Sequence, residues 1–250
     1  MNGALNRAAL LRVRKNRRNH FTGIQAVTFD VGGTLIEPWP SVGHIYAETA
    51  LRHGVKGAVP DLLNRQFAAA WKAKTNFDYS RAVWRELVEK TFAGLGGAAT
   101  GSNLFEKLYE RFESPEVWRV FEDVRPALAA LRRQNFKLGL ISNWDERLRP
   151  LLKKLDLIQY LDTVVISVET GFTKPAAEIF QQAADEMGLA TQSILHIGDS
   201  IAEDFEGARN AGLPSLLLDR KGEGQVEQTI ASLEEICSLL ELPGSSTESD

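Results

Sequence analysis

The chain has 250 residues, of which 44% are apolar and 25% are charged, and its net charge is −4. This length allows a full core with an inserted module, and the lack of any run of about 18 apolar residues excludes a transmembrane helix. The single cysteine, Cys237, excludes an intramolecular disulfide, and its apolar helical surroundings favour a packing role. We therefore expect a soluble globular enzyme in the cytoplasm.

The two ends of the chain differ from its body in composition. Residues 1–29 carry six basic and no acidic side chains, so residues 1–22 are predicted to form a basic, disordered leader. An organelle-targeting peptide, an arm for nucleic acid or anionic lipid, and a start codon assigned too early remain alternatives for it. The rest of the chain is acidic, and we expect neither a nucleic-acid nor a membrane partner for it. Residues 243–250 are predicted to be a disordered tail.

The first apolar run, residues 24–29, predicts a buried strand, because an acid and two glycines follow closely after it. From about residue 41 to 118 the apolar residues recur at helical spacing, which predicts a helical module. The stripes of this module include Trp71, Trp84 and Trp118. We interpret these tryptophans as core residues rather than as a substrate-binding surface.

Beyond residue 119 the pattern changes to alternating helices and strands. We predict helices at residues 127–134, 146–154, 176–187 and 203–211, and strands at residues 137–141, 163–167, 193–197 and 214–218. Strands separated by helices imply right-handed crossovers and a parallel sheet that is covered on both faces. The predicted fold is therefore α/β, a Rossmann-like parallel sheet core (residues 23–38 and 119–242) with an inserted helical cap (residues 39–118).

Polar side chains follow several of the predicted strands. These residues, in chain order, are Asp30, Ser142, Asn143, Lys174 and Asp199. Open α/β sheets keep their chemistry at the carboxyl ends of their strands. A hydroxyl, a cation and two carboxylates gathered there are the parts needed to hold a metal and a phosphoryl group around a nucleophile.

The order of these segments resembles the haloacid dehalogenase (HAD) superfamily, whose members are hydrolases with an aspartate nucleophile. The resemblance covers roughly residues 24–240. It rests on residues 29–35, 141–143, 174–175 and 198–200 with an acid following at position 204. In addition, residues 29–35, 41–46, 53–55 and 141–145 together are similar to the REG-2-like subgroup of that superfamily.

The resemblance implies a metal site at the nucleophile. Asp30 is expected to attack phosphorus, and Asp30, Asp199 and the backbone carbonyl of Gly32 are expected to bind Mg²⁺. Asp204 is expected to lie beside the metal ligands or to bind the metal through water, although an acid in a first helical turn is also an ordinary cap. Thr34 is expected to support the loop by hydrogen bonding.

The resemblance also implies a phosphoryl site. Ser142, Asn143 and Lys174 are expected to bind the phosphoryl group of a small phosphorylated substrate, and Lys174 is expected to orient the nucleophile as well. Asp30, Ser142 and Lys174 are thus the expected catalytic residues. Without this context, a Ser-Asn pair after a strand is commonly a helix cap.

Gly32 departs from the pattern of most phosphatases in the superfamily. They carry there a carboxylate that protonates the leaving oxygen, a contribution worth roughly a hundred- to ten-thousand-fold in rate. The loss of this carboxylate favours aryl or acyl phosphates, whose leaving groups need no proton, over alkyl phosphates. We therefore expect a slowed Mg²⁺-dependent phosphatase that acts on a small phosphorylated metabolite through an aspartyl-phosphate. The alternative is a catalytically weakened protein that binds a ligand or a protein partner.

Two related chemistries are less favoured. Dehalogenases need no metal and depart from the Gly198–Asp199 pair that this chain keeps. Phosphonatases use an imine-forming lysine in the cap, and we interpret Lys72 and Lys74 as solvated helix lysines instead. Three further polar residues, His44, His53 and Glu37, are interpreted as surface or capping groups rather than as proton shuttles. The identity of the substrate and the oligomeric state are left open.

Overall fold

The computed structural model describes residues 21–75, 77–95, 102–222 and 226–240. Most of the predicted leader and the predicted tail therefore lie outside the described residues. Phe21, at the start of the described part, donates a backbone hydrogen bond to the carbonyl of Leu239 at 2.8 Å. Among the described helices, none has the length and apolarity needed to cross a membrane.

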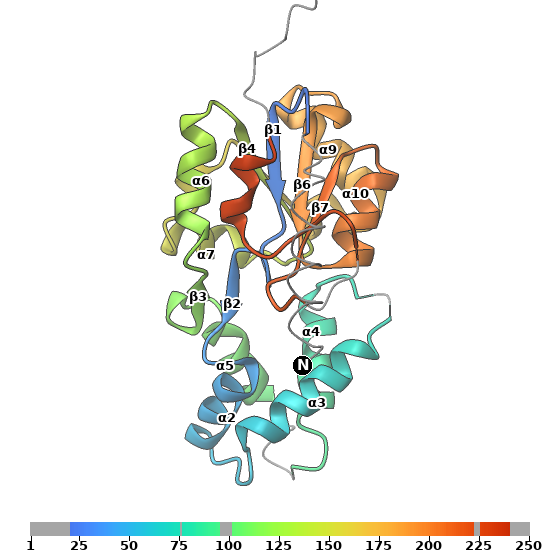
Figure 1. Ribbon diagram of the computed structural model, residues 1–250. Helices are drawn as coiled ribbons and strands as arrows, with labels where there is room; N and C mark the ends of the chain where they lie inside the picture. The colour runs from blue at the N-terminus through green and yellow to red at the C-terminus, as the bar shows by residue number, and fades with distance from the viewer. Residues whose placement is uncertain (1–20, 76, 96–101, 223–225, 241–250) are drawn as a thin grey trace, which may run out of the picture.

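A parallel sheet forms the centre of the α/β part (Figure 1). Within the described ranges it has six strands in the order β5-β4-β1-β6-β7-β8, and every pairing is parallel. The strands are β1 (Ala26–Phe29), β4 (Lys137–Ser142), β5 (Thr163–Ile166), β6 (Ile194–Gly198), β7 (Ser215–Leu218) and β8 (Thr229–Ile230). The predicted α/β fold with a parallel sheet is confirmed.

Successive side chains of β1 point to opposite layers, as the pleat of a strand requires. Val27 and Phe29 belong to one hydrophobic cluster, and Ala26 belongs to the other. The first cluster includes residues of α6 (Val124–Arg133), α7 (Leu148–Lys154) and the 3₁₀ helix η5 (Leu233–Ser238). The second includes residues of α9 (Ala177–Met187) and α10 (Gly207–Asn210). Helices thus cover both faces of the sheet, as predicted.

Several elements differ from the sequence-based prediction. The helix predicted at residues 146–154 begins at Leu148, because the Asp145 carboxylate accepts a hydrogen bond from the Arg147 backbone N–H and holds a turn there. The helix predicted at residues 203–211 is a π-helix, η4 (Ile201–Glu206), that continues into α10. Cys237 lies half-buried in η5 and packs against the first cluster. The remaining short helices are α8 (Ser167–Thr170), η1 (Pro115–Val117), η2 (Ile158–Tyr160) and η3 (Thr191–Ser193).

Four helices lie at one end of the molecule, below the sheet in Figure 1: α2 (Val42–Arg52), α3 (Pro60–Lys72), α4 (Arg81–Thr91) and α5 (Ser102–Arg111). They share a hydrophobic cluster of their own, which contains Leu63, Phe92 and Leu108. A close approach of α2 and α3 is fixed at Gly43, where a Cβ would lie 2.2 Å from the carbonyl oxygen of Pro60. The helical module predicted from the sequence is thus present as a separately packed group.

Two short strands join this group to the sheet, a feature that the sequence did not predict. β2 (Ile36–Pro38) pairs antiparallel with β3 (Trp118–Val120), so the outgoing and returning chains run side by side. Both predicted boundaries of the cap, 38/39 and 118/119, fall at this ribbon. The division into core and cap stays a prediction, because hydrophobic clusters alone do not define independent domains.

Candidate active site

Asp30 lies at the carboxyl end of β1, between the ends of β4 and β6. Its backbone N–H donates to the carbonyl of Ile197 at 2.9 Å, which extends the ladder by one residue and fixes the start of the loop. The hydroxyl of Ser142, the last residue of β4, donates to Asp30 Oδ1 at 3.2 Å. Parallel strands therefore bring together two residues that are 112 positions apart in the chain.

Lys174 forms the centre of the charged cluster. Its ammonium Nζ donates to Asp30 Oδ1 at 2.6 Å and to Asp204 Oδ1 at 2.5 Å, and only 1% of its side chain is exposed. Burial opposes its charge, but Asp204 and then Asp30 raise the pKa of Lys174 above its ordinary value. Lys174 therefore stays protonated and holds the Asp30 carboxylate in one orientation.

Asn143 positions Lys174 through the backbone rather than through the ammonium. Its Oδ1 accepts from the Lys174 N–H at 2.7 Å, and its Nδ2 donates to the Lys174 carbonyl at 3.0 Å and to Glu203 Oε2 at 3.1 Å. The Asn143 amide is thus committed to the protein on both sides. In this arrangement it orients the lysine.

Three carboxylates, those of Asp30, Asp199 and Asp204, each offer an oxygen within 4.8 Å of the others. Burial, partly offset by Lys174, raises the pKa of Asp30 to about 6. Asp199 lines the cavity and is partly accessible from it. Burial by the surrounding protein, followed by the charges of Asp30 and Asp204, raises the pKa of Asp199 to about 7. Gly33 allows this approach, since a Cβ there would lie 2.2 Å from Asp199 Oδ2.

Asp204 has a different environment from the other two acids. Besides Lys174, it accepts from the Ser200 backbone N–H at 3.0 Å and lies 3.3 Å from His196 Nε2. Although burial acts in the opposite direction, Lys174 and then His196 lower the pKa of Asp204 below its ordinary value. Asp204 lies in the π-helix, near the predicted first turn, and it stabilises Lys174.

His196 was missed by the sequence analysis. It is fully buried in β6, its Nδ1 lies 3.0 Å from the Thr28 hydroxyl, and burial lowers its pKa. The chain Thr28–His196–Asp204 therefore lies beneath the lysine. The signal in the sequence was a single histidine within the apolar run of residues 194–197, a pattern that seldom marks a site by itself.

The loop after Asp30 is held differently from the prediction. The buried Thr34 hydroxyl has no hydrogen-bond partner among the described residues, so the expected hydrogen bonding at Thr34 does not come from its side chain. Instead, the Thr34 carbonyl accepts from Arg220 Nη2 at 2.8 Å, and Arg220 is paired with Asp123 at 2.8 Å. The anchor comes from a residue far along the chain, which local sequence does not reveal.

Gly32 faces an indole ring. A Cβ at Gly32 would lie 3.3 Å from Cζ3 of Trp144, a tighter contact than most side chains make. The backbone of Trp144 is fixed by the Ser167 hydroxyl, which lies 3.0 Å from both its N–H nitrogen and its carbonyl oxygen. A side chain at position 32 would therefore begin in tight contact with this ring.

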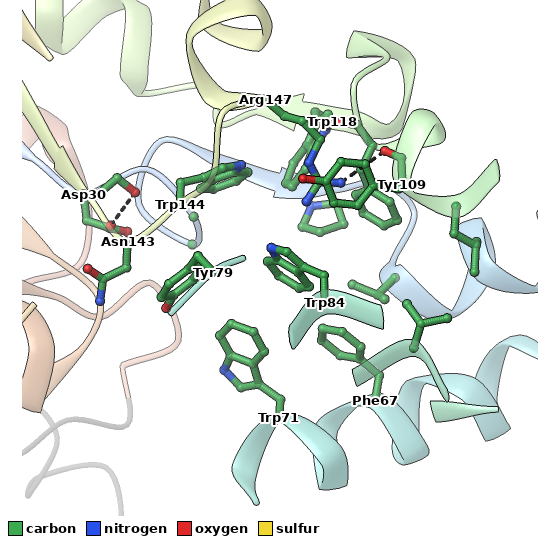
Figure 2. Close-up of a pocket in the computed structure, with 18 of the residues that line it drawn as sticks. Asp30, Phe67, Trp71, Tyr79, Trp84, Tyr109, Trp118, Asn143, Trp144 and Arg147 are labelled. Atoms are coloured by element: carbon green, nitrogen blue, oxygen red, sulfur yellow. Dashed lines mark hydrogen bonds between the residues drawn. The ribbon is translucent and has the colours of Figure 1, made fainter. Parts of the chain in front are cut away.

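A cavity of about 480 Å³ extends from these residues toward the four helices (Figure 2). Asp30, Gly32, Ser142, Asn143 and Asp199 line its polar end. Aromatic side chains line much of the remainder: Tyr46, Phe67, Trp71, Tyr79, Trp84, Phe105, Tyr109, Phe112, Trp118 and Trp144. The three cap tryptophans are half-buried: Trp84 and Trp118 pack against hydrophobic clusters, as a core role requires, but all three also line the cavity, which the core interpretation did not include. The sequence analysis did not single out Tyr79, and it included Trp144 only within the segment 141–145.

Other polar candidates lie outside this cavity. His44 Nδ1 lies 2.8 Å from the Ser41 hydroxyl at the start of α2, and His53 Nδ1 lies 2.8 Å from the Thr49 carbonyl oxygen. Glu37 pairs with Arg119 on the two-stranded ribbon. These side chains have the capping and surface roles expected for them.

The lysine prediction is confirmed for Lys72, which is exposed, but Lys74 is not a freely solvated side chain. Its ammonium lies 3.6 Å from Glu203 Oε1 and 4.3 Å from the centre of the Trp71 ring. Lys74 is therefore held at the edge of the aromatic wall.

Comparison with known proteins agrees with this architecture. The family model for haloacid dehalogenase-like hydrolases matches residues 24–212. The haloacid dehalogenase-like hydrolase domain-containing protein 3 of Bos taurus is 32% identical over 210 residues, which are 80% of this chain and 83% of that protein. The Rhythmically expressed gene 2 protein of Drosophila melanogaster is 32% identical over 217 residues, 78% of this chain and 83% of that one.

Solved structures show the same fold at lower identity. The HAD-hydrolase YfnB of Bacillus subtilis superposes with a TM-score of 0.71 at 19% identity, covering 86% of this chain and 98% of that one. A HAD phosphatase of Thermococcus onnurineus has a TM-score of 0.65 at 23% identity, covering 86% and 97%. The chain thus belongs to the haloacid dehalogenase-like hydrolases, in their REG-2-like subgroup.

Proposed function

We propose that this hydrolase is a Mg²⁺-dependent phosphatase that uses Asp30 as its nucleophile. The observation that carries this proposal is the double contact at Asp30 Oδ1, which accepts from both Ser142 and Lys174. A carboxylate is a weak nucleophile toward a phosphoryl dianion unless its charge is offset and its orientation fixed. Lys174 supplies the charge, and the two donors together supply the orientation.

The acidic cluster fits a divalent cation. Asp30 and Asp204 contact Lys174, and an oxygen of Asp199 lies within 4.8 Å of theirs, so one positive charge faces three carboxylates among the described side chains. Burial is the main cause that raises the pKa values of Asp30 and Asp199, and repulsion from the neighbouring carboxylates adds to it. Asp30, Asp199 and the carbonyl of Gly32 would hold the ion, and oxygen ligands of this kind suit Mg²⁺. The YfnB structure is described as bound to magnesium, which supports this choice.

The bound ion would draw charge from the phosphoryl oxygens. In the first step, a carboxylate oxygen of Asp30 attacks phosphorus while the ester P–O bond breaks and its electron pair departs with the leaving oxygen. In the second, water attacks phosphorus of the aspartyl-phosphate, releasing inorganic phosphate and a proton and restoring the carboxylate. Ser142 and Lys174 stabilise the developing charge, and Asn143 keeps Lys174 in place.

Turnover should depend strongly on the leaving group, because Gly32 carries no acid and Trp144 occupies the adjacent space. Aryl and acyl phosphates are therefore the proposed substrates, and alkyl phosphates should be slow. The same two residues support the second candidate function, a protein that binds a phosphorylated ligand without hydrolysing it. A small phosphorylated molecule is the partner in both cases.

The test is hydrolysis of acetyl phosphate and para-nitrophenyl phosphate with and without Mg²⁺. We expect metal-dependent turnover that Asp30→Asn abolishes. Asp185→Asn, an exposed acid on α9, is the matched control and should retain full activity. Metal-dependent turnover that survives in Asp30→Asn would refute the nucleophile. No turnover combined with tight, Mg²⁺-dependent phosphate binding would favour the second candidate.

A further inference from the structure

The cavity beyond the phosphoryl site has two aromatic walls (Figure 2). The cap wall contains Trp71 and Trp84, whose rings stack with their centroids 5.9 Å apart, and Phe67, which stacks on Trp71 at the same distance. The opposite wall contains Trp118 and Trp144, with centroids 5.3 Å apart. Trp144 belongs to both regions, since its ring also faces Gly32. The aromatic surface therefore begins beside the reacting group.

Arg147 lines this cavity and Lys74 lies against the wall residue Trp71, and each of these cations is already paired. Arg147 donates to Asp145 through Nε at 2.8 Å and through Nη2 at 2.5 Å, and Nη1 donates to the Tyr109 carbonyl at 3.1 Å. Lys74 lies against Glu203 and the Trp71 ring. Within the described part of the chain, this end of the cavity offers no unpaired charge for a second phosphate or a carboxylate. The walls thus favour an uncharged group.

The size of the cavity also argues against a very small substrate. Its volume of about 480 Å³ lies within the range of roughly 300–1,000 Å³ that is typical of sites for larger organic ligands. A leaving group of two or three carbon atoms would leave most of the aromatic surface uncovered. A flat ring system covers it best, because aromatic faces and edges pack in offset and edge-to-face contacts.

Resting on the phosphatase activity proposed above, we propose that the physiological substrate is an aryl phosphate, the phosphate monoester of a phenol, with its ring system between the two aromatic walls. The ring system fits the aromatic walls of the cavity. The aryl oxygen can leave without being protonated, so it needs no acid at position 32. When Asp30 attacks phosphorus, the P–O(aryl) bond breaks and its electron pair leaves on the aryl oxygen, where the ring delocalises it. The phenolate then takes a proton from solvent.

The first test compares substrates that separate the ring from the leaving group. The set is acetyl phosphate, phenyl phosphate, 2-naphthyl phosphate and 2-naphthylmethyl phosphate, which keeps the naphthyl ring but leaves as an alkoxide. We expect kcat/KM for 2-naphthyl phosphate at least tenfold above that for phenyl phosphate. The naphthylmethyl ester should bind as tightly but turn over at least a hundredfold more slowly, because the absent acid is worth about that much. Equal kcat/KM for phenyl and naphthyl esters would overturn the proposal.

The second test removes the wall. Trp71→Leu and Trp84→Leu should each lower the ratio of kcat/KM for 2-naphthyl phosphate to that for acetyl phosphate by about tenfold, a change of about 1.4 kcal/mol. Trp84→Phe keeps an aromatic face, should retain most of the ratio, and tests the same wall if the leucine variants unfold. Trp39→Leu is the matched control, because Trp39 is 45% exposed and lies against Arg119 outside the cavity. A ratio unchanged in every cavity variant would overturn the proposal.

These outcomes can be told apart from failure of the phosphatase itself. If acetyl phosphate is hydrolysed in an Asp30-dependent way without any preference for rings, only the aromatic substrate class is wrong. If nothing is hydrolysed, titration of 2-naphthyl phosphate into Asp30→Asn decides the matter by tryptophan fluorescence. Binding at least tenfold tighter than that of acetyl phosphate, weakened by Trp84→Leu, would support the aromatic site alone. Equal binding of both compounds would overturn it.

Discussion

Restoring the missing acid should require two substitutions rather than one. Gly32→Asp places a carboxyl group two residues after Asp30, the proposed nucleophile, where general acid catalysis would be worth roughly 10² to 10⁴ in rate, or about 3 to 5 kcal/mol of barrier. However, a Cβ at this position already meets Trp144 Cζ3 at 3.3 Å. Trp144 is held there by the contact of its ring with Trp118 and by the hydrogen bonds between its backbone and the Ser167 hydroxyl. The carboxyl group of the single variant therefore has little room to reach the leaving oxygen.

We expect Gly32→Asp alone to raise kcat for ethyl phosphate by no more than about tenfold, which is below the roughly hundredfold minimum expected of a working general acid. Gly32→Asp combined with Trp144→Ala should recover the full 10² to 10⁴. The assay is steady-state release of phosphate for all four members of the double-mutant cycle, which isolates the coupling between the two positions.

The matched control is Gly32→Asn combined with Trp144→Ala, which has the same shape but no proton to give. A full gain from Gly32→Asp alone would show that Trp144 does not exclude the acid. Equal rates for the Asp and Asn double variants would show that a carboxyl group at position 32 does not protonate the leaving oxygen in this fold. Either result would refute the reasoning.

Two further predictions concern stability. Lys174→Met should destabilise the metal-free protein by about 3 kcal/mol, because Asp30 and Asp204 would face each other without their buried cation; equilibrium urea unfolding measures this, and an unchanged midpoint would contradict it. Burial alone would raise the pKa of Asp123, but hydrogen bonds from Arg220, Leu233 and Ser232 outweigh it and lower that pKa below its ordinary value. Its stabilising contribution should be complete above about pH 4 and lost as the pH falls through the lowered pKa. Asp123→Asn should flatten that part of the stability profile between pH 2 and 5, and a profile as steep as that of the unchanged protein would argue against the assignment.

The position of Asp30, Ser142 and Asp199 at one edge of the sheet was predictable from the sequence. Each follows an apolar run that predicts a strand, and parallel strands necessarily bring their carboxyl ends together. The contact between Lys174 and Asp30 was expected only through the family resemblance, because a Lys-Pro pair in a loop has no periodic pattern of its own. The short strand β8, with two residues, was below the length that periodicity can detect.

The aromatic cavity could not be predicted in the same way. Trp71 and Trp84 each belong to an apolar stripe of their own helix. The spacing of such a stripe is the same whether the helix face packs into a core or borders a cavity. Only the arrangement of α3 and α4 relative to Trp118 and Trp144 decides between the two. His196 and the place of Trp144 on the cavity wall were missed for a similar reason, because the partners of both residues lie on other strands and loops.

The π-helix around Asp204 is a second local feature that the sequence pattern did not indicate. The backbone N–H groups of Asp204 and Phe205 both donate to the Ser200 carbonyl, at 3.0 Å each, which widens the turn. Gly198 allows the Asp204 side chain to lie against β6, since a Cβ there would be 2.2 Å from Asp204 Cγ. The helical pattern of residues 203–211 contains no sign of this widening.

Chemical trapping of the aspartyl-phosphate would test the role of Asp30 most directly. The protein is mixed with acetyl phosphate and Mg²⁺, quenched in acid during turnover, reduced with borohydride and mapped by peptide mass spectrometry. We predict conversion of Asp30 to homoserine, dependent on both substrate and Mg²⁺, with Asp199 and Asp204 unmodified. Steady turnover with an unmodified Asp30, or with the modification on another residue, would contradict the role of Asp30 as nucleophile.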